Sequence, residues 1–386
     1  MQVTAAHHPR APVRVQAEGS VTHMSSAVRR LVPIAALLLL AFVLACPAVA
    51  AAAAPPGYFG VDFVTETSGW VVGSDSTILY TANGGTAWQT QLSASGGASL
   101  LDVCVLAGGK TGWAVGTAGT VLRTVDGKTW TRVFSPALNA GWDYTSVKFV
   151  DARTGWICGG VAAGPMQGTP QGAILKSTDG GVTWSAPAAV FAGWCPRKLD
   201  AVSATVAVCA GIQRVTAGGG SNAPALVQTA DGATWGSAPT LLRPAATQTA
   251  EVGDVAMVAG KKAASVFVIG DYYDLLPPTP WAFTGDTGAA AFKYVAAPAA
   301  GPRQLRGLCM TSATAGFAVG GGSAAVLKTT NGGAAWSAVA APLCQNLYAV
   351  DFPTSSTGYA VGRTTAGTAA TVLKTTKSAA SWTTVK

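Results

Sequence analysis

Histidine and glutamate are the residue types that this sequence lacks where catalysis would need them. The chain has 386 residues, and its only three histidines, His7, His8 and His23, lie near the N-terminus. Beyond residue 54 only two glutamates remain, Glu66 and Glu251. The body of the chain therefore offers no imidazole base or metal ligand and no Ser-His-Asp or Cys-His machinery. Glycosidases usually need two opposed carboxylates, so this class is disfavoured as well.

Charged residues and helical patterns are also scarce. Only 11% of the residues are charged and 49% are hydrophobic, with 47 glycines and a formal net charge of +8. This composition excludes a disordered chain and supplies core for one large domain or two smaller ones. Basic residues are dispersed, and no glycine loop has the pattern that binds phosphate. We expect a monomer with no catalytic residue, no cofactor, no metal and no nucleic-acid partner.

The longest apolar run belongs to an N-terminal leader, residues 1–54. Arg29 and Arg30 precede LVPIAALLLLAFVLA, and the small residues Ala48–Ala50 suit a signal peptidase, which predicts an export signal. An uncleaved membrane anchor is the alternative, because Leu31–Ala54 is long enough to span a bilayer. Either Met24 is the true start, or residues 1–28 are a transit segment placed before the export signal.

The cysteines that follow the leader are even in number. In an exported chain an even number permits disulfides, and six cysteines allow fifteen connectivities. Buried free thiols that act as small hydrophobic side chains are the alternative. The six are Cys104, Cys158, Cys195, Cys209, Cys309 and Cys344.

Three short motifs recur along the body of the chain. Residues Ser177–Trp184 have the sequence STDGGVTW, in which Asp and Gly favour a tight turn. Related boxes end at Trp88, Trp130, Trp235, Trp336 and Trp382, with a decayed copy at Thr284–Phe292. A GWAVG-type motif precedes each box, and an apolar motif such as GVDFV opens each unit. Each motif, counted separately, gives seven units of about 47 residues, which indicates a repeat architecture.

Each unit predicts four short antiparallel strands, because runs of Val, Ile, Phe and Trp alternate with Gly, Asp, Asn and Thr. One such sheet cannot bury both faces alone, so the sheets must stack around an axis. The sequence therefore predicts an all-β, seven-bladed β-propeller over residues 55–386, after the export signal. The predicted blades span residues 57–98, 99–142, 143–196, 197–248, 249–302, 303–344 and 345–386.

The box lies between the third and fourth predicted strands of a blade, so we predict that it is a structural turn. Its Asp or Asn accepts hydrogen bonds from the amides of the turn, its glycines supply positive φ, and its Trp fills the space between blades. The predicted structural residues are Asn83, Trp88, Asp126, Trp130, Asp179, Trp184, Asp231, Trp235, Asn331, Trp336 and Trp382.

The repeated GWAVG, VLRT and DG-TW motifs resemble those of the Asp-box (BNR-type) propellers, and within them the photosystem II stability and assembly factor family. The resemblance covers Gly57–Lys386. It implies a non-enzymatic scaffold for protein–protein interaction, which binds membrane-protein complex subunits or assembly intermediates, photosystem II among them. It also implies the thylakoid lumen as the destination in a phototroph, and otherwise the periplasm or the exterior. The arginine-rich patch of that family's assembly factors has no residue-by-residue match here, where the arginines are scattered.

A glycan-binding protein or a sialidase-like glycoside hydrolase is the alternative function, because sialidases also contain Asp-boxes. Tyr272 and Tyr273 precede Asp274, as a tyrosine nucleophile with a nearby acid would require. The early arginine motif of the sialidases is missing, however, and we expect no enzymatic activity.

The loops on the face opposite the boxes are the predicted partner-binding site. The loops between the second and third strands are enlarged at Gly160–Gly172, Ile212–Pro224 and Asp271–Trp281. Loops on a rigid scaffold commonly carry recognition, and Trp, Tyr and Arg are enriched at protein interfaces. The predicted partner-binding residues are Trp142, Trp194, Arg197, Lys198, Arg243, Tyr272, Tyr273, Trp281, Arg303 and Arg306.

Overall fold

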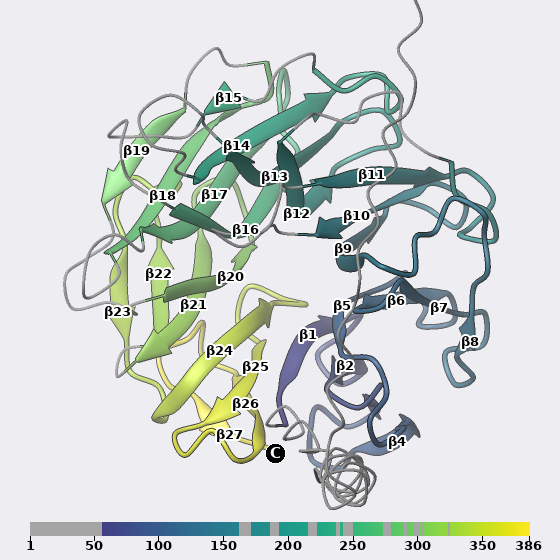
Figure 1. Cartoon of the computed structure of the whole chain (residues 1–386). Coiled ribbons are helices and arrows are strands. Elements are labelled where there is room, and N and C mark those ends of the chain that lie inside the picture. The colour runs from purple at the N-terminus through teal and green to yellow at the C-terminus, as the bar shows by residue number, and fades with distance from the viewer. Residues whose placement is uncertain are drawn as a thin grey trace, which may run out of the picture. The chain divides into compact units, whose positions relative to one another are not determined.

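The computed structural model divides the chain into two units, residues 1–53 and 54–386, of which the second forms one compact body. It describes residues 56–161, 171–185, 193–214, 222–236, 240–241, 250–272, 279–288, 292–296, 302, 304–322 and 325–386, all within the second unit. Every regular element among these residues is a β-strand, which confirms the all-β prediction (Figure 1). None of them forms a helix with the length and apolar character that crossing a bilayer requires. The predicted leader lies outside the described residues.

The strands of the first half form antiparallel sheets in which neighbours along the chain pair with each other. The first sheet contains β1 (Tyr58–Phe63), β2 (Gly69–Gly73), β3 (Ile78–Thr81) and β4 (Gln89–Leu92). The second contains β5 (Leu100–Val105), β6 (Gly112–Gly116), β7 (Thr120–Thr124) and β8 (Thr131–Arg132). The third contains β9 (Asp143–Phe149), β10 (Gly155–Val161) and β11 (Gln171–Ser177), and the bridge from Lys176 to Ser185 stands where a fourth strand would pair.

The second half repeats this order. The fourth sheet contains β12 (Trp194–Ala201), β13 (Ala207–Arg214), β14 (Asn222–Thr229) and β15 (Thr240–Leu241). The fifth contains β16 (Ala250–Val258), β17 (Ser265–Tyr272), β18 (Thr279–Asp286) and β19 (Lys293–Ala296). The last eight strands are β20 (Gln304–Met310), β21 (Gly316–Gly322), β22 (Val326–Thr329), β23 (Ser337–Val339), β24 (Cys344–Asp351), β25 (Gly358–Thr364), β26 (Ala370–Thr375) and β27 (Thr383–Thr384). They count as one sheet because β21 also pairs with β24.

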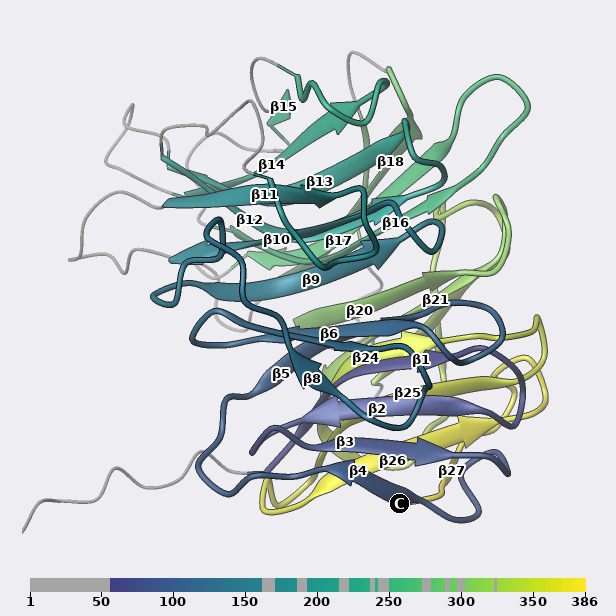
Figure 2. The ribbon, with the colours of Figure 1, turned by 90° about the vertical axis from the view of Figure 1, so that its right-hand side faces the viewer.

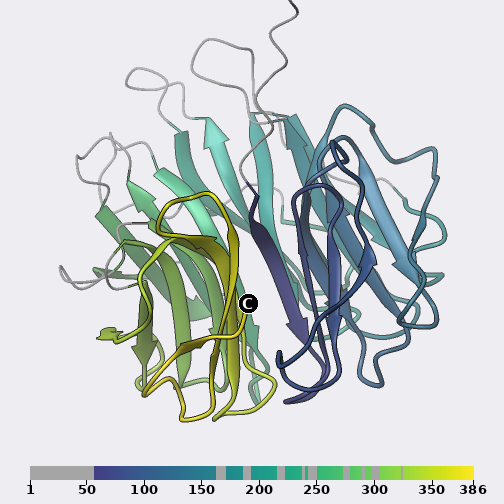
Figure 3. The same cartoon turned by 90° about the horizontal axis from the view of Figure 1, so that it is seen from below.

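The first strands of successive sheets surround a common centre (Figure 1). Each contacts the first strand of the next sheet, and β24 contacts β1, so that the circle of contacts is complete. Figures 2 and 3 show the sheets from the side, with their strands running between two loop-bearing faces. The circle closes without an exchanged strand, because β1–β4 pair among themselves and β24–β27 do the same.

The GW motif is explained by its position in the second strand of a sheet. All five residues of β2 and of β6 are buried, because a second strand has neighbours on both edges and sheets on both faces. The glycine accommodates a side chain from the first strand, which is an aromatic ring at Gly69 and Gly155. A Cβ added at Gly155 would lie 2.4 Å from the ring of Phe149, which excludes any larger residue there.

Aromatic rings join neighbouring units. The Trp113 ring of β6 stacks on Phe149 of β9 with 3.3 Å between centroids, and the box residue Trp184 meets Phe149 edge-on at 5.8 Å. Aromatic pairs in such arrangements add stability beyond the area that they bury. The same trio recurs as Tyr359, Phe63 and Trp88, and as Phe317, Phe352 and Trp382.

The box is a turn held by its own side chains. Asp179 accepts hydrogen bonds from the backbone N–H groups of Val182 (3.1 Å) and Thr183 (3.0 Å), and Ser177 Oγ accepts one from Gly181 N (2.8 Å). Gly180 N donates to Arg153 O (2.9 Å), so the box lies beside the turn between β9 and β10. The boxes around Asn83, Asp126, Asp231 and Asn331 contain equivalent bonds.

We predict that Ser177→Ala lowers the free energy of unfolding by about 1–3 kcal/mol, because it leaves the N–H of Gly181 without its acceptor inside the turn. The Ser177 side chain is only 1% exposed, so water cannot replace the lost oxygen. Chemical denaturation followed by circular dichroism measures the change. Ser93→Ala, at an exposed position, is the control, and an equal loss in both variants would contradict the role given to Ser177.

Candidate functional site

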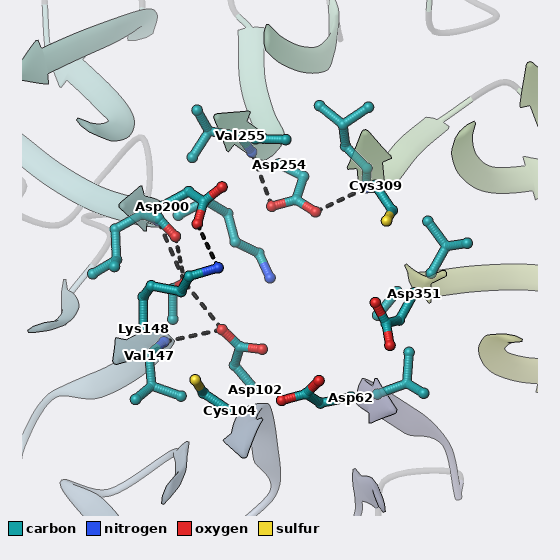
Figure 4. A pocket seen from close by; sticks show the side chains of 18 of the residues that line it. Asp62, Asp102, Cys104, Val147, Lys148, Asp200, Asp254, Val255, Cys309 and Asp351 are labelled. Atoms are coloured by element: carbon teal, nitrogen blue, oxygen red, sulfur yellow. Dashed lines mark hydrogen bonds and ion pairs between the residues drawn. The ribbon is translucent and has the colours of Figure 1, made fainter. Parts of the chain in front are cut away.

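A cavity of about 280 Å³ lies at the centre of the circle of first strands. Each first strand contributes residues at two heights along the axis, which we call levels. The residue of the second strand with which each one pairs defines its level. The level of Asp62, which pairs with Trp70, also holds Cys104, Lys148, Asp200, Ala256, Cys309 and Asp351. The adjacent level holds Gly60, Asp102, Ser146, Lys198, Asp254, Gly307 and Ala349. The aspartates of both levels point toward the centre (Figure 4).

The carboxylates of this cavity bind the backbone of the neighbouring unit. Asp102 Oδ2, for example, accepts a hydrogen bond from Val147 N at 3.0 Å and another from Ser146 Oγ at 3.0 Å. The other bonds of this kind join Asp62 to Val105 N (2.5 Å), Asp200 to Met257 N (2.8 Å), Asp254 to Leu308 N (2.8 Å) and Asp351 to Phe63 N (2.7 Å). We call these the inter-unit carboxylate bonds. The bond from Asp351 to Phe63 N joins the last unit to the first.

The charges in the cavity are only partly balanced. Five aspartates face two lysines, and Lys148 Nζ forms an ion pair with Asp200 at 2.8 Å. Burial, followed by the nearby charge of Asp351, raises the pKa of Asp62 to about 7. Burial also raises the pKa of Asp254 and that of Asp351 to about 6. Backbone N–H groups that donate to these carboxylates lower the pKa and so offset part of the effect of burial. The attraction of Asp200 raises the pKa of Lys148.

This arrangement supports a structural role for the cavity carboxylates. Each of the five accepts a backbone N–H from the next unit, so each helps to hold two neighbouring first strands together. Among the described residues, no group of three or more His, Cys, Asp or Glu side chains is arranged to hold a metal ion.

A second cavity of about 330 Å³ adjoins the first and is lined by irregularities of the first strands. Each first strand has a β-bulge at the same height, where one extra residue is inserted opposite the second strand. The inserted residues are Phe59, Leu101, Thr145, Arg197, Gly253, Arg306 and Tyr348, which we call the mouth ring. The mouth ring lies toward the beginnings of the first strands, on the side away from the boxes.

The mouth ring combines aromatic and cationic side chains. Arg306 lies 3.6 Å from Glu251 and also donates to Gln304 at 3.3 Å. Arg197 is half-buried, and Lys198 lines both cavities. Beside the ring, Arg363 lies 5.6 Å from the centroid of Phe59 and 5.7 Å from that of Tyr348, which is cation–π distance.

The structure gathers three of the predicted partner-binding residues, Arg197, Lys198 and Arg306, in this second cavity. Trp142 is half-buried and packs on the core between β6 and β9.

Three other predicted residues are buried in strands instead of lying in loops. Trp194 belongs to β12, Tyr272 to β17 and Trp281 to β18, and each is at most 2% exposed. The strands of the fourth and fifth sheets are longer than their motifs suggest, so they include residues that we expected in the connections. Tyr273, Arg243 and Arg303 lie outside the described residues.

Sequence reasoning missed Phe59, Leu101, Thr145, Gly253 and Tyr348 of the mouth ring. The sequence did contain a signal for them. In every opening motif, the mouth-ring residue directly precedes the first residue that belongs to the two levels of the central cavity. The bulge that turns this position toward the axis has no sequence pattern of its own. Only an alignment of the seven opening motifs could have suggested that these residues share a site.

The fold and its turns define the class of protein, an Asp-box β-propeller. Residues 54–219 match the family model described as "Photosynthesis system II assembly factor YCF48". The chain is therefore similar, over residues 54–219, to the photosystem II assembly factor-like propellers with BNR repeats, as its motifs predicted. The search of curated proteins returned no match.

Solved structures show the same fold. One is described as "YCF48 bound to D1 peptide", with 15% identity, a TM-score of 0.52, and coverage of 84% of this chain and 95% of that one. YCF48 from Cyanidioschyzon merolae is 16% identical with a TM-score of 0.54, covering 83% of this chain and 96% of that one. A PL25 ulvan lyase is 9% identical with a TM-score of 0.55, covering 86% and 96%. The fold is thus shared by binding proteins and enzymes, and residues must decide between them.

Proposed function

We propose that this chain is a non-catalytic, seven-bladed scaffold that binds a membrane-protein complex or its assembly intermediate through the mouth ring. The observation that supports this most directly is the mouth ring itself, where Arg197, Arg306, Phe59 and Tyr348 surround one cavity. Arginine and aromatic side chains in a partly desolvated pocket are typical of residues that dominate binding energy. In a phototroph, the proposed partner is a photosystem II subunit such as D1, which the similar YCF48 structure contains as a peptide.

Export belongs to the same proposal. The leader would direct the propeller across a membrane, to the thylakoid lumen of a phototroph and otherwise to the periplasm or the exterior. The circle of contacts from β1 to β24 supports seven blades. The inter-unit carboxylate bonds support a non-catalytic role, because they assign the cavity aspartates to holding the ring together.

The test is a pull-down from detergent-solubilised thylakoid membranes, with immunodetection of D1. The variant Arg197→Glu/Arg306→Glu reverses two charges in the mouth ring. Its matched control, Lys128→Glu/Arg153→Glu, reverses two exposed charges on the side of the boxes. We expect the wild type and the control to recover D1, and the mouth variant to lose most of it. Equal recovery by both variants would overturn the mouth ring as the site, and release of sugar from a fluorogenic glycoside would favour a hydrolase instead.

A further inference from the structure

Three of the six cysteines after the leader meet at one interface. Cys158 lies in β10 of the third sheet, whereas Cys195 and Cys209 lie in β12 and β13 of the fourth. All three are at most 1% exposed. The remaining cysteines lie elsewhere, since Cys104 and Cys309 line the central cavity and Cys344 belongs to β24. The three thiols at the interface between the third and fourth sheets therefore do not belong to the lining of the central cavity.

Backbone pairing places Cys158 and Cys209 side by side. Within their own sheets, Cys158 pairs with Ser146 and Cys209 pairs with Leu199. Ser146 Oγ in turn bonds across the interface, accepting from Leu199 N at 3.3 Å. Residues that pair directly across antiparallel strands lie about 5 Å apart. The bond between Ser146 and Leu199 therefore aligns the two cysteines from facing sheets.

The surroundings of the two sulfurs agree with this alignment. Cys158 and Cys209 belong to one packed cluster, together with Trp156, Ile174 and Val227. The Cys158 thiol is a hydrogen-bond partner of Cys209, and burial followed by this bond raises the pKa of Cys209. The charge of a Cys158 thiolate would also act on Cys195, so the third thiol is close enough to be a competing partner.

We propose that Cys158 and Cys209 form a disulfide that links the third and fourth units of the propeller. In this step a disulfide-bearing oxidant, such as oxidised glutathione or a dithiol oxidase, accepts two electrons. The two thiols lose their protons, one S–S bond forms in the protein, and the S–S bond of the oxidant becomes two thiols. Because both sulfurs are fully buried in the folded chain, the exchange takes place while the chain folds. The link closes a long loop, so it restricts the unfolded chain and stabilises the fold.

Peptide mapping tests the proposal, because lysines and arginines separate the three cysteines. The full chain is refolded in a glutathione redox buffer, denatured, alkylated and digested with trypsin. Cys158 then lies in residues 154–176, Cys195 in 177–197 and Cys209 in 199–214. We expect peptides 154–176 and 199–214 to be recovered as one linked species that reducing agent splits. Recovery of both as separate alkylated peptides, or a link from either to 177–197, would overturn the proposal.

Variants separate the link from a purely packing role. Cys195→Ala and Cys344→Ala should keep the linked species, whereas Cys209→Ala should lose it. Dithiothreitol should lower the melting temperature of the wild type and of Cys344→Ala by several degrees, and leave that of Cys209→Ala unchanged. If Cys209→Ala fails to fold, the retained link in Cys195→Ala decides the pairing alone. Equal sensitivity to dithiothreitol in Cys209→Ala and the wild type would contradict the proposal.

Discussion

Replacing Trp113 by alanine is expected to lower the free energy of unfolding by about 3–5 kcal/mol. The side chain is fully buried and stacks on Phe149 of the next unit at 3.3 Å. Its Nε1 donates to Gly180 O at 2.9 Å, so it also fixes the box turn of that unit. The substitution therefore leaves a cavity between two sheets and removes a hydrogen bond from a buried acceptor at the same time.

Urea unfolding followed by circular dichroism measures this loss without relying on tryptophan fluorescence. Trp113→Phe keeps the stacked ring but lacks the N–H donor, so we expect it to recover part of the stability. Phe134→Ala removes an aromatic side chain that is 83% exposed and should change stability by no more than about 0.5 kcal/mol. A loss below about 1 kcal/mol for Trp113→Ala would show that contacts between units contribute little to the fold.

The interior of each unit could be predicted from the sequence because its causes are local. The glycine of each GW motif is required by a side chain of the adjacent strand, which is Phe149 for Gly155 and Val105 for Gly112. The box residues satisfy backbone groups a few positions away, as Asp179 does for Thr183. Local causes of this kind recur along the chain, and this recurrence makes them visible in the sequence.

The central cavity could not be predicted in the same way, because its causes lie between units. Asp62, Asp102, Asp200 and Asp254 lie in or beside the opening motifs, where the sequence favours no more than a turn or edge role. In the structure each accepts a hydrogen bond from a strand that follows it by more than 40 positions, as Asp102 does from Val147. Which backbone N–H group meets each carboxylate becomes apparent only when the sheets are placed around the axis.

Lowering the pH from 8 to about 5 is expected to stabilise the propeller by on the order of 3 kcal/mol. Burial raises the pKa of Asp271 to about 7, with Leu305 N as a compensating donor, and Asp62, Asp254 and Asp351 are raised similarly. In the unfolded chain these carboxyls return to a pKa near 3.8. The folded state thus binds protons more tightly between pH 7 and 4, so that its stability increases as the pH falls through this window.

The aspartates of the boxes determine the pH below which further acidification no longer stabilises the fold. The N–H groups of Thr129 and Lys128 lower the pKa of Asp126, and those of Ala233 and Thr234 lower that of Asp231. A carboxylate with a lowered pKa stabilises the fold at neutral pH, and this contribution is lost as the pH falls below about 4. We therefore expect a maximum of stability near pH 4–5, with a decline on both sides.

The variant Asp62→Asn isolates the cavity's part of this dependence. Asparagine carries no charge but keeps an oxygen for Val105 N, so the variant should melt at a higher temperature than the wild type at pH 8. At pH 5, where Asp62 is already protonated, the two should melt at nearly the same temperature. Asp286→Asn, at an exposed position, should leave the pH profile unchanged. A wild-type melting temperature that stays level or falls as the pH is lowered from 8 to 5 would contradict this prediction. It would show that water in the cavity keeps these carboxylates ionised at little cost in free energy. Asp351 would then accept the hydrogen bond from the first unit as a charged carboxylate.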